Sequence, residues 1–271
     1  MGKAAAFFDL DKTVIATSSV LAFGRPFYRD GLMSRRDVVK AAYAQLTFKM
    51  GKTDDAQIAR IRDQVATLCR GWSVEQVQQI VNETLAELIN PYIYAEAAAL
   101  IAEHQHAGRD VVLVSASGEE IVRPIGAQLG IHDVIATRMG VKDGHYSGEV
   151  EFYAAGPSKA AAVREMAADR AYDLTASYAY SDSSSDLPLL ESVGNPTAVN
   201  ASRSLRKIAT DRGWPILEFR HPIPLGRRLR DKPAVPVAAA VGIGMVVAAG
   251  LVWYGRTRRS RAMIPEAASM R

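Results

Sequence analysis

Residues 4–14 read Ala-Ala-Ala-Phe-Phe-Asp-Leu-Asp-Lys-Thr-Val, an apolar run that ends in two carboxylates. The apolar part is typical of a buried β-strand, where a charge is unfavourable unless the strand ends and the charge finds a partner. Asp9 and Asp11 are two residues apart, so both side chains of an extended chain project to the same side. Such a pair suits a Mg²⁺-dependent phosphoryl-transfer site, because Mg²⁺ prefers oxygen ligands that it shares with phosphate. A strand that ends in a solvated Asp-x-Asp turn explains this segment equally well.

After residue 108, short apolar runs alternate with helical patterns. The expected strands are 111–115, 134–137, 176–181 and 197–199, and the expected helices are 118–129, 158–169, one near 187, and 202–213. Residues 140–152, with Asp143-Gly144 near their start, predict a β-hairpin. Strands that alternate with helices indicate an α/β fold with a doubly wound parallel sheet.

The block from 18 to 107 differs, because its apolar residues recur at helical spacing throughout. A helical block between the first and second strands must lie outside the sheet, as a cap over the strand ends. We therefore expect a catalytic core made of 1–17 and 108–219, with a helical cap at 18–107.

The charge of the chain is unevenly distributed. The 271 residues carry a formal charge of +4, with 33 Lys and Arg against 29 Asp and Glu. From Arg220 onward there are ten basic and two acidic residues, which leaves 23 basic and 27 acidic residues in 1–219. A mildly acidic domain argues against nucleic-acid binding. The single cysteine, Cys69, excludes an internal disulfide and reads as a small core residue.

A membrane anchor is expected near the C-terminus. Residues 233–255 contain no charged residue, and as a helix they would span roughly 34 Å at 1.5 Å per residue. Eight Lys and Arg flank this segment, in a linker at 220–232 and a tail at 256–271. A buried core helix is the alternative, but basic residues at both ends favour a single-pass transmembrane helix. Because no secretory signal is evident at the N-terminus, we expect the catalytic domain on the cytoplasmic side of the cell membrane.

Polar residues gather at the expected strand ends, where active sites of open α/β sheets lie. They form four groups in chain order: Asp9 with Asp11, Ser115 with Ala116, Lys159, and Asp182 with Asp186. Each group alone has a plain explanation, such as a helix cap, a solvated lysine or loop acids. Their combination on one scaffold favours a single catalytic site.

In these four groups the sequence resembles the haloacid dehalogenase superfamily, in its phosphoserine-phosphatase-like branch with a C1-type helical cap. The resemblance covers about 1–219 and implies a Mg²⁺-dependent phosphatase. It implies that Asp9 is the nucleophile and that Asp11 transfers the proton. Ser115 and Ala116 would bind phosphate, together with Lys159, which would offset negative charge. Mg²⁺ would be held by Asp9, Asp11, Asp182 and Asp186, with Asp11 using its carbonyl and Asp186 acting indirectly.

The sequence departs from the phosphoserine phosphatase pattern in three places. Ser18 stands where that enzyme has Glu, Ser115-Ala116-Ser117 stands where it has Ser-Gly-Gly, and Ser185 stands where it has Asn. Each change removes a contact to an amino-acid substrate. The specificity for phosphoserine is therefore not expected to carry over, and the expected membrane anchor points to a small or lipid-linked phosphomonoester as substrate. Two alternatives remain: a phosphoserine phosphatase with altered recognition, or a catalytically weak membrane-tethered scaffold.

Overall fold

The computed structural model describes residues 2–33, 63–64 and 66–222. The predicted transmembrane helix at 233–255, the tail at 256–271 and most of the linker at 220–232 lie outside these residues. Within the described ranges, no helix is both long enough and apolar enough to cross a bilayer.

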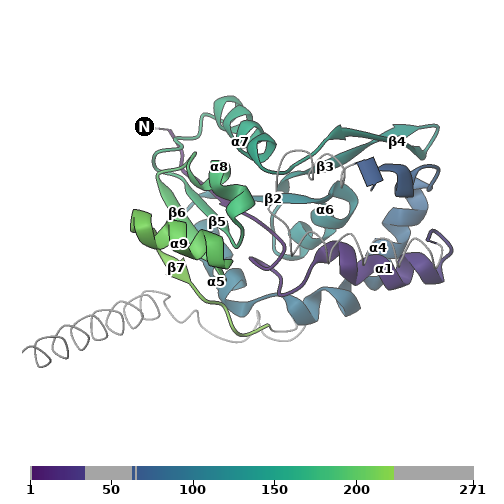
Figure 1. Ribbon diagram of the computed structural model, residues 1–271, viewed down its shortest axis with the longest axis horizontal. Coiled ribbons are helices and arrows are strands. Elements are labelled where there is room, and N and C mark those ends of the chain that lie inside the picture. Colours follow the sequence, from purple (N-terminus) through teal and green to yellow (C-terminus); the bar gives the residue numbers. More distant parts are fainter. Residues whose placement is uncertain (1, 34–62, 65, 223–271) are drawn as a thin grey trace, which may run out of the picture. The chain divides into compact units, whose positions relative to one another are not determined.

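A seven-stranded sheet organises the described part of the chain (Figure 1). Its strands are β1 (Ala5–Phe8), β2 (Asp110–Gly118), β3 (Asp133–Lys142), β4 (His145–Phe152), β5 (Tyr178–Ser181), β6 (Asn195–Val199) and β7 (Ile216–Leu217). The spatial order is β4-β3-β2-β1-β5-β6-β7. All neighbours pair in parallel except β3 and β4, which form the predicted antiparallel hairpin. The doubly wound sheet is therefore confirmed, with β1 at the point where the strand order reverses.

Helices lie on both faces of the sheet. They are α1 (Ser19–Arg29), α4 (Val74–Leu88), α5 (Ala95–His106), α6 (Glu119–Gln128), α7 (Pro157–Asp169), α8 (Leu187–Leu190) and α9 (Arg203–Arg212), with short 3-10 turns at Asn90–Tyr92 and Ser184–Asp186. Ala5 and Phe7 of β1 belong to a core with side chains of α7, α8 and α9. Ala6 and Phe8 belong to a second core, which includes residues of α1, α4, α5 and α6. Successive strand residues point to opposite faces, so an uninterrupted apolar strand is buried on both sides.

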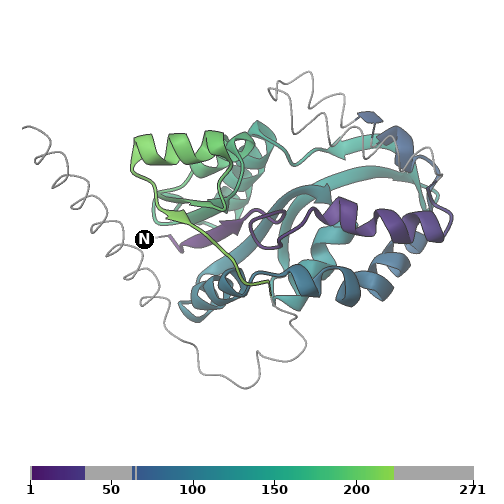
Figure 2. The ribbon, with the colours of Figure 1, turned by 60° about the horizontal axis from the view of Figure 1, so that its bottom comes forward.

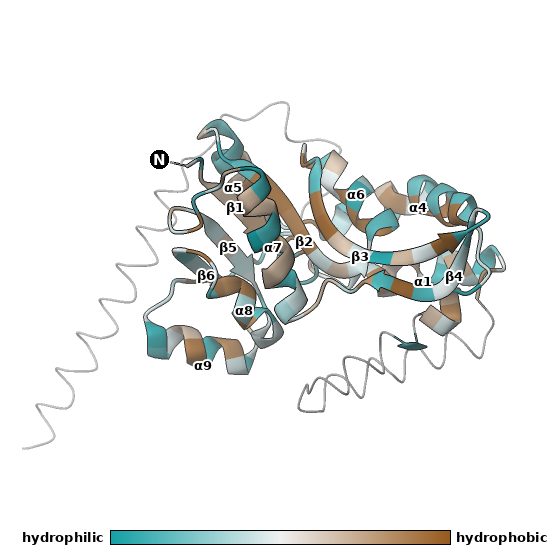
Figure 3. Ribbon diagram, turned by 90° about the horizontal axis from the view of Figure 1, so that it is seen from above, coloured by the Kyte–Doolittle hydropathy of each residue, from teal (hydrophilic) through white to brown (hydrophobic). Residues whose placement is uncertain are grey.

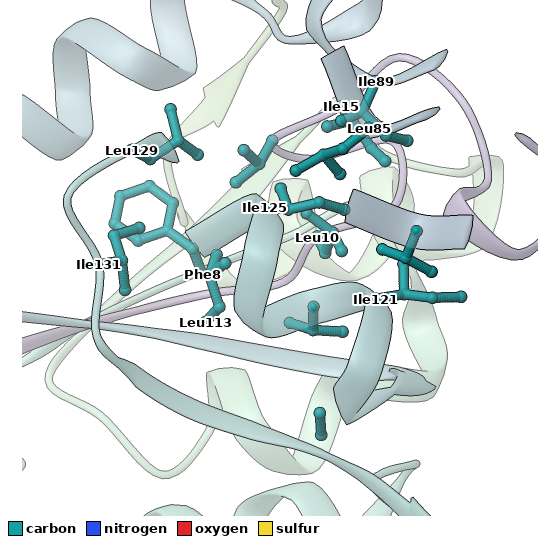
Figure 4. Close-up of a cluster of buried hydrophobic side chains, with 14 of the residues drawn as sticks. Phe8, Leu10, Ile15, Leu85, Ile89, Leu113, Ile121, Ile125, Leu129 and Ile131 are labelled. Atoms are coloured by element: carbon teal, nitrogen blue, oxygen red, sulfur yellow. The ribbon is translucent and has the colours of Figure 1, made fainter. Parts of the chain in front are cut away.

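The second core joins the sheet to the cap helices. Figure 4 shows Phe8 and Leu113 of the sheet in one cluster with Ile121 and Ile125 of α6 and Leu85 of α4. Coloured by hydropathy, β2 and β3 carry long apolar stretches, whereas α4 and α9 alternate between polar and apolar residues (Figure 3). The strands thus form the buried layer, and the helices turn one face to solvent.

Two expectations from the sequence need correction. The helix at 95–106, expected in the cap, packs on the sheet: His104 is buried edge-on against the rings of Phe8 and Tyr180. Strand β2 continues to Gly118, three residues beyond the expected end at Ser115. The pairing of β2 with β3 shifts register between Ser115 and Gly118, which lets the strand bend instead of ending.

The two chain segments that join core and cap pair with each other. The backbone N–H of Ala16 donates to Tyr92 O at 2.7 Å, and that of Tyr94 donates to Val14 O at 3.0 Å. We call residues 14–16 and 92–94 the cap hinge. Because the two segments are hydrogen-bonded, they form one connection between cap and core.

A third segment, residues 219–222, adds to this hinge, and we call it the strap. In Figure 2, the green segment that follows β7 runs to the loop that precedes α5 in the chain. Tyr94 forms a β-bridge with Pro222, and Ala95 N–H donates to His221 O at 2.9 Å. The Glu96 carboxylate accepts bonds from the backbone N–H groups of Arg220 and His221. The first three residues of the predicted linker are therefore part of the folded domain.

Candidate active site

A tight turn after β1 carries the first acidic pair. Asp9 directly follows the strand, and its N–H donates to Tyr180 O of β5 at 2.9 Å. The N–H groups of Val14 and Ile15 both donate to Leu10 O, which closes the turn. Lys12 adopts a φ of 61° within it, in the left-handed region. The turn holds Asp9 and Asp11 at the carboxyl end of the strand at which the sheet order reverses.

Lys159 lies at the centre of a buried ionic cluster. Its ammonium donates to Asp9 Oδ1 at 2.6 Å and to Asp186 Oδ2 at 2.9 Å. The exposed fractions of the three residues are 3% for Lys159, 6% for Asp9 and 3% for Asp186. Ser181 Oγ donates to the same Asp186 oxygen at 2.7 Å. Asp9 and Asp186 thus meet at one buried cation, although they are 150 and 27 positions away from Lys159 along the chain.

Asp182 follows β5 and lies at the same edge of the sheet. It is buried, and its Oδ2 is 3.7 Å from the ammonium of Lys12, which is largely exposed. Its charge acts on Asp9, and the charge of Asp11 acts on it, so the three carboxylates are close in space. This edge of the sheet therefore carries four carboxylates against two ammonium groups.

Ser115 and Ala116 lie on β2, the strand next to β1. Ser115 is buried and its hydroxyl accepts the N–H of Ser117 at 3.2 Å, whereas Ala116 is exposed. The carbonyl of Ala116 accepts a bond from Thr137 Oγ1 at 2.7 Å. The strand continues beyond Ser115, and α6 begins only at Glu119. The N–H groups available beside Ser115 therefore belong to a bent strand end.

Burial governs the protonation of these groups. It raises the pKa of Asp9 well above its usual range, against the attraction of Lys159. It raises the pKa of Asp182 to about 6, against the attraction of Lys12, and it also raises the pKa of Asp11. Burial disfavours the charge of Lys159, but Asp186 and Asp9 outweigh it, so the pKa of Lys159 is raised. Asp9, Asp11 and Asp182 therefore hold protons more readily than free aspartates do, and Lys159 keeps its proton more firmly than a free lysine does.

The donor chemistry of this edge fits a hard divalent cation. Among the described residues, no three His, Cys, Asp or Glu side chains are grouped so that they could hold a metal ion. Asp186 is bound by Lys159 and Ser181, and the Asp11 side chain accepts the N–H of Ser19 at 3.0 Å. Asp9 is also bound by Lys159, and Asp182 lies beside Lys12. Carboxylates and backbone carbonyls are nonetheless oxygen donors, the kind of ligand that a hard divalent cation takes.

Several contacts at this edge were not predicted from the sequence. Ser181 donates a hydrogen bond to Asp186, and Ser19 donates one to Asp11. Lys12 lies beside Asp182. No role was predicted for these three partners. Ser181 directly precedes Asp182, so its place at a strand end was a usable signal. The contact of Ser19 with Asp11 gave no such signal, because it depends on the path of the chain into the cap.

The chain has relatives of high sequence identity. It is 55% identical to the "Inhibition of morphological differentiation protein" of Streptomyces azureus, over 95% of each chain. It is 52% identical to a probable phosphatase of Mycobacterium tuberculosis (strain ATCC 25618 / H37Rv), over 95% of this chain and 90% of that protein. A crystal structure of a protein of unknown function from Bordetella pertussis Tohama I matches with a TM-score of 0.71 and 28% identity, over 80% of this chain and 99% of that chain.

The family comparison agrees with the geometry. Residues 6–191 match the family of haloacid dehalogenase-like hydrolases. This range begins in β1, before Asp9, and ends after Asp186, so it contains every residue of the buried ionic cluster. The chain is therefore a phosphatase that belongs to the haloacid dehalogenase-like hydrolase family.

Proposed function

We propose that this enzyme hydrolyses phosphomonoesters through a phosphoryl group carried transiently on Asp9. The observation that carries the proposal is the buried ion pair of Lys159 with Asp9 at 2.6 Å. A carboxylate in this place can act as a nucleophile, and the ammonium offsets the negative charge as a phosphate approaches.

The first half of the reaction is a displacement at phosphorus. An oxygen of Asp9 forms a bond to phosphorus, and the bond from phosphorus to the ester oxygen breaks. The ester oxygen keeps the electron pair and takes a proton from Asp11. The raised pKa of Asp11 supports this role, because a buried carboxyl group retains its proton closer to neutral pH.

The second half regenerates the enzyme. Asp11, now a carboxylate, takes a proton from a water molecule, whose oxygen attacks phosphorus. The bond from phosphorus to the Asp9 oxygen breaks, and inorganic phosphate leaves. Ser115 and the N–H groups beside it would hold the phosphate oxygens during both halves.

We propose Mg²⁺ as the cation, held by the carboxylates of Asp9 and Asp182 and the carbonyl of Asp11. A bound divalent cation would supply positive charge to the phosphate oxygens as negative charge builds up. Asp186 keeps its indirect role, because it fixes the ammonium of Lys159 at 2.9 Å.

The substitution Asp9→Asn tests the proposal. With 4-nitrophenyl phosphate and Mg²⁺, we expect the variant to lose turnover and the parent to show an acid-stable mass increase of one phosphoryl group on the Asp9 peptide. Asp211→Asn makes the same chemical change on the exposed surface of α9 and should leave turnover unchanged. Turnover by Asp9→Asn at the parental rate would refute the mechanism. A parent without measurable turnover would favour the alternative of a catalytically weak scaffold.

We further propose that residues 233–255 anchor the enzyme to the cell membrane with the catalytic domain in the cytoplasm. The support is the uncharged stretch of 23 residues and its eight flanking basic residues. The substrate would then be a small or lipid-linked phosphomonoester. Full-length protein should remain in the membrane fraction after a carbonate wash, whereas a variant that combines Val241→Lys, Val246→Lys and Leu251→Lys should be released. Release of the unaltered protein by carbonate would contradict the anchor.

A further inference from the structure

The first helix of the cap has an unusual N-terminus. Helix α1 begins at Ser19, and the side chain of its preceding residue, Ser18, forms no capping hydrogen bond to the helix. The N–H of Ser19 donates instead to Asp11 Oδ1 at 3.0 Å. Helix N-terminal N–H groups lack partners within the helix and attract negative charge. The carboxyl group of Asp11 therefore serves as the cap of the first cap helix.

The side chain of Ser19 reaches across the boundary between cap and core. Its hydroxyl lies 2.7 Å from the hydroxyl of Ser117, which belongs to β2. Both serines are buried, with exposed fractions of 0% for Ser19 and 5% for Ser117. The N–H of Ser117 in turn donates to Ser115 Oγ at 3.2 Å. A continuous path of three hydrogen bonds thus runs from Asp11 through Ser19 and Ser117 to Ser115.

We propose that Ser117 is a positioning residue, which holds Ser19 and thereby fixes the carboxyl group of Asp11 for proton transfer. The inference rests on the proposed function, because it assumes that Asp11 protonates the leaving group. Ser117 is separated from Ser19 by 98 positions and lies on the core, whereas Ser19 lies on the cap. Their contact exists only while α1 is seated on the core, so it links the placement of the proton donor to the seating of the cap.

This role makes a prediction about chemistry that a purely structural role does not. A leaving group with a high pKa needs the proton as the ester bond breaks, whereas a leaving group with a low pKa departs without much help. A poorly placed Asp11 should therefore slow the first kind of substrate more than the second. A variant that merely loosened the fold would slow both kinds by the same factor.

The test measures kcat/KM for a series of substituted phenyl phosphates, with the parent, Ser117→Ala, Ser19→Ala and the double variant. For Ser117→Ala we expect a loss of about tenfold with phenyl phosphate and of about twofold or less with 4-nitrophenyl phosphate. The plot of log kcat/KM against leaving-group pKa then becomes steeper. The double variant should be no slower than the worse single variant, because both substitutions remove the same hydrogen bond.

Ser204→Ala is the matched control. Its hydroxyl bonds to another serine, Ser184, at 2.9 Å, on the exposed surface of α9. This variant should keep the parental slope. A slope for Ser117→Ala equal to that of the parent, or losses that add in the double variant, would overturn the inference.

Two further measurements separate this outcome from failure of the proposed function. Asp11→Asn should give the steepest slope of all, and a parental slope in that variant would refute the role of Asp11 itself. Thermal unfolding of each serine variant shows whether it is folded at the assay temperature. Because the slope compares substrates within one preparation, partial loss of folded enzyme leaves it unchanged.

Discussion

At the scale of single residues, Lys159 is the group on which the site depends most. It is a buried cation between Asp9 and Asp186, with 3% of its own surface exposed. Each carboxylate would be an uncompensated buried charge without it. The lysine therefore serves both the fold and the proposed chemistry.

Replacement of Lys159 by Met should lower the free energy of unfolding by about 3–5 kcal/mol at pH 7, because two buried carboxylates lose their partner. Urea denaturation measures this change. Lys207→Met, on the exposed surface of α9, is the control and should stay within about 0.5 kcal/mol of the parent. A loss below about 1 kcal/mol for Lys159→Met would mean that water already reaches the ion pair.

His104 supports the strand that precedes the site. Its Nε2 lies 2.8 Å from Tyr180 Oη, and its Nδ1 accepts a bond from Arg109 Nε at 2.6 Å. Burial, assisted by the charge of Arg109, lowers the pKa of His104 to about 4. The histidine is therefore neutral in the folded protein at neutral pH.

This shift predicts a pH-dependent stability. Between about pH 6.5 and pH 4 the unfolded chain binds a proton at His104 and the folded chain does not, so the stabilisation is lost as the pH falls. The free energy of unfolding of the parent should therefore fall towards that of His104→Phe over this window, by about 3 kcal/mol at most. Urea denaturation at several pH values measures the difference. A difference that is constant from pH 7 to pH 4.5 would contradict the shift.

At this scale the sequence predicts which charged residues gather at the site, but not the contacts that hold them. Buried strands precede Asp9, Asp182 and Asp186, and a helix begins near Lys159. These positions along the chain already indicate a shared edge of the sheet. Ser19 and Ser117, in contrast, are 98 positions apart and have common side chains. Nothing in their local pattern indicates that they meet, because their contact is decided by how the cap is seated.

At the scale of helices and strands, local patterns predict the type of element better than its neighbours. The uninterrupted apolar run of β1 correctly predicts a strand buried on both faces. The helix α5 has apolar residues that would suit either cap or sheet, so the sequence placed it in the cap. Strand β7 has only two residues and no pattern of its own, so it was not predicted.

One glycine illustrates how closely two elements approach. A Cβ on Gly194, between α8 and β6, would lie within bonding distance of the carbonyl oxygen of Thr175. Gly24, inside α1, has nothing within 4 Å of such an atom. Position 24 therefore has room for a side chain, whereas position 194 has none.

Gly194→Ala should lower the melting temperature, because backbone must move to accommodate the methyl group, with a loss of about 1–3 kcal/mol. Gly24→Ala should raise stability by about 0.5–1 kcal/mol, since alanine is the better helix former. Differential scanning calorimetry distinguishes the two. If Gly194→Ala were as stable as the parent, the approach of residues 175 and 194 would be looser than described.

At the scale of the whole molecule, the cap and the core are joined by the cap hinge, and the strap completes it. The strap is held chiefly by Glu96, whose carboxylate accepts two backbone N–H groups and lies 2.7 Å from His221 Nδ1. The sequence predicted that a cap is inserted after the first strand. It did not predict the strap, because residues 220–222 resemble the basic linker that follows them.

Glu96→Gln should loosen the strap and leave the sheet intact. We expect the N–H groups of Arg220, His221 and Ala95 to exchange with deuterium faster, while those of β1 and β5 keep the parental rate. Hydrogen exchange followed by mass spectrometry measures both sets. Glu191→Gln removes an exposed partner of Arg212, outside the strap, and serves as the control. Equal exchange in the two variants would show that the strap does not depend on Glu96.

The strap also determines where a mechanical load would enter this enzyme. Pro222, the last of the described residues, is bridged to Tyr94 in the cap hinge. Tension applied to the polypeptide beyond that point would be felt first at the pivot of the cap. Tethering such a molecule to any surface would therefore load the connection between cap and core before it loaded the reacting groups.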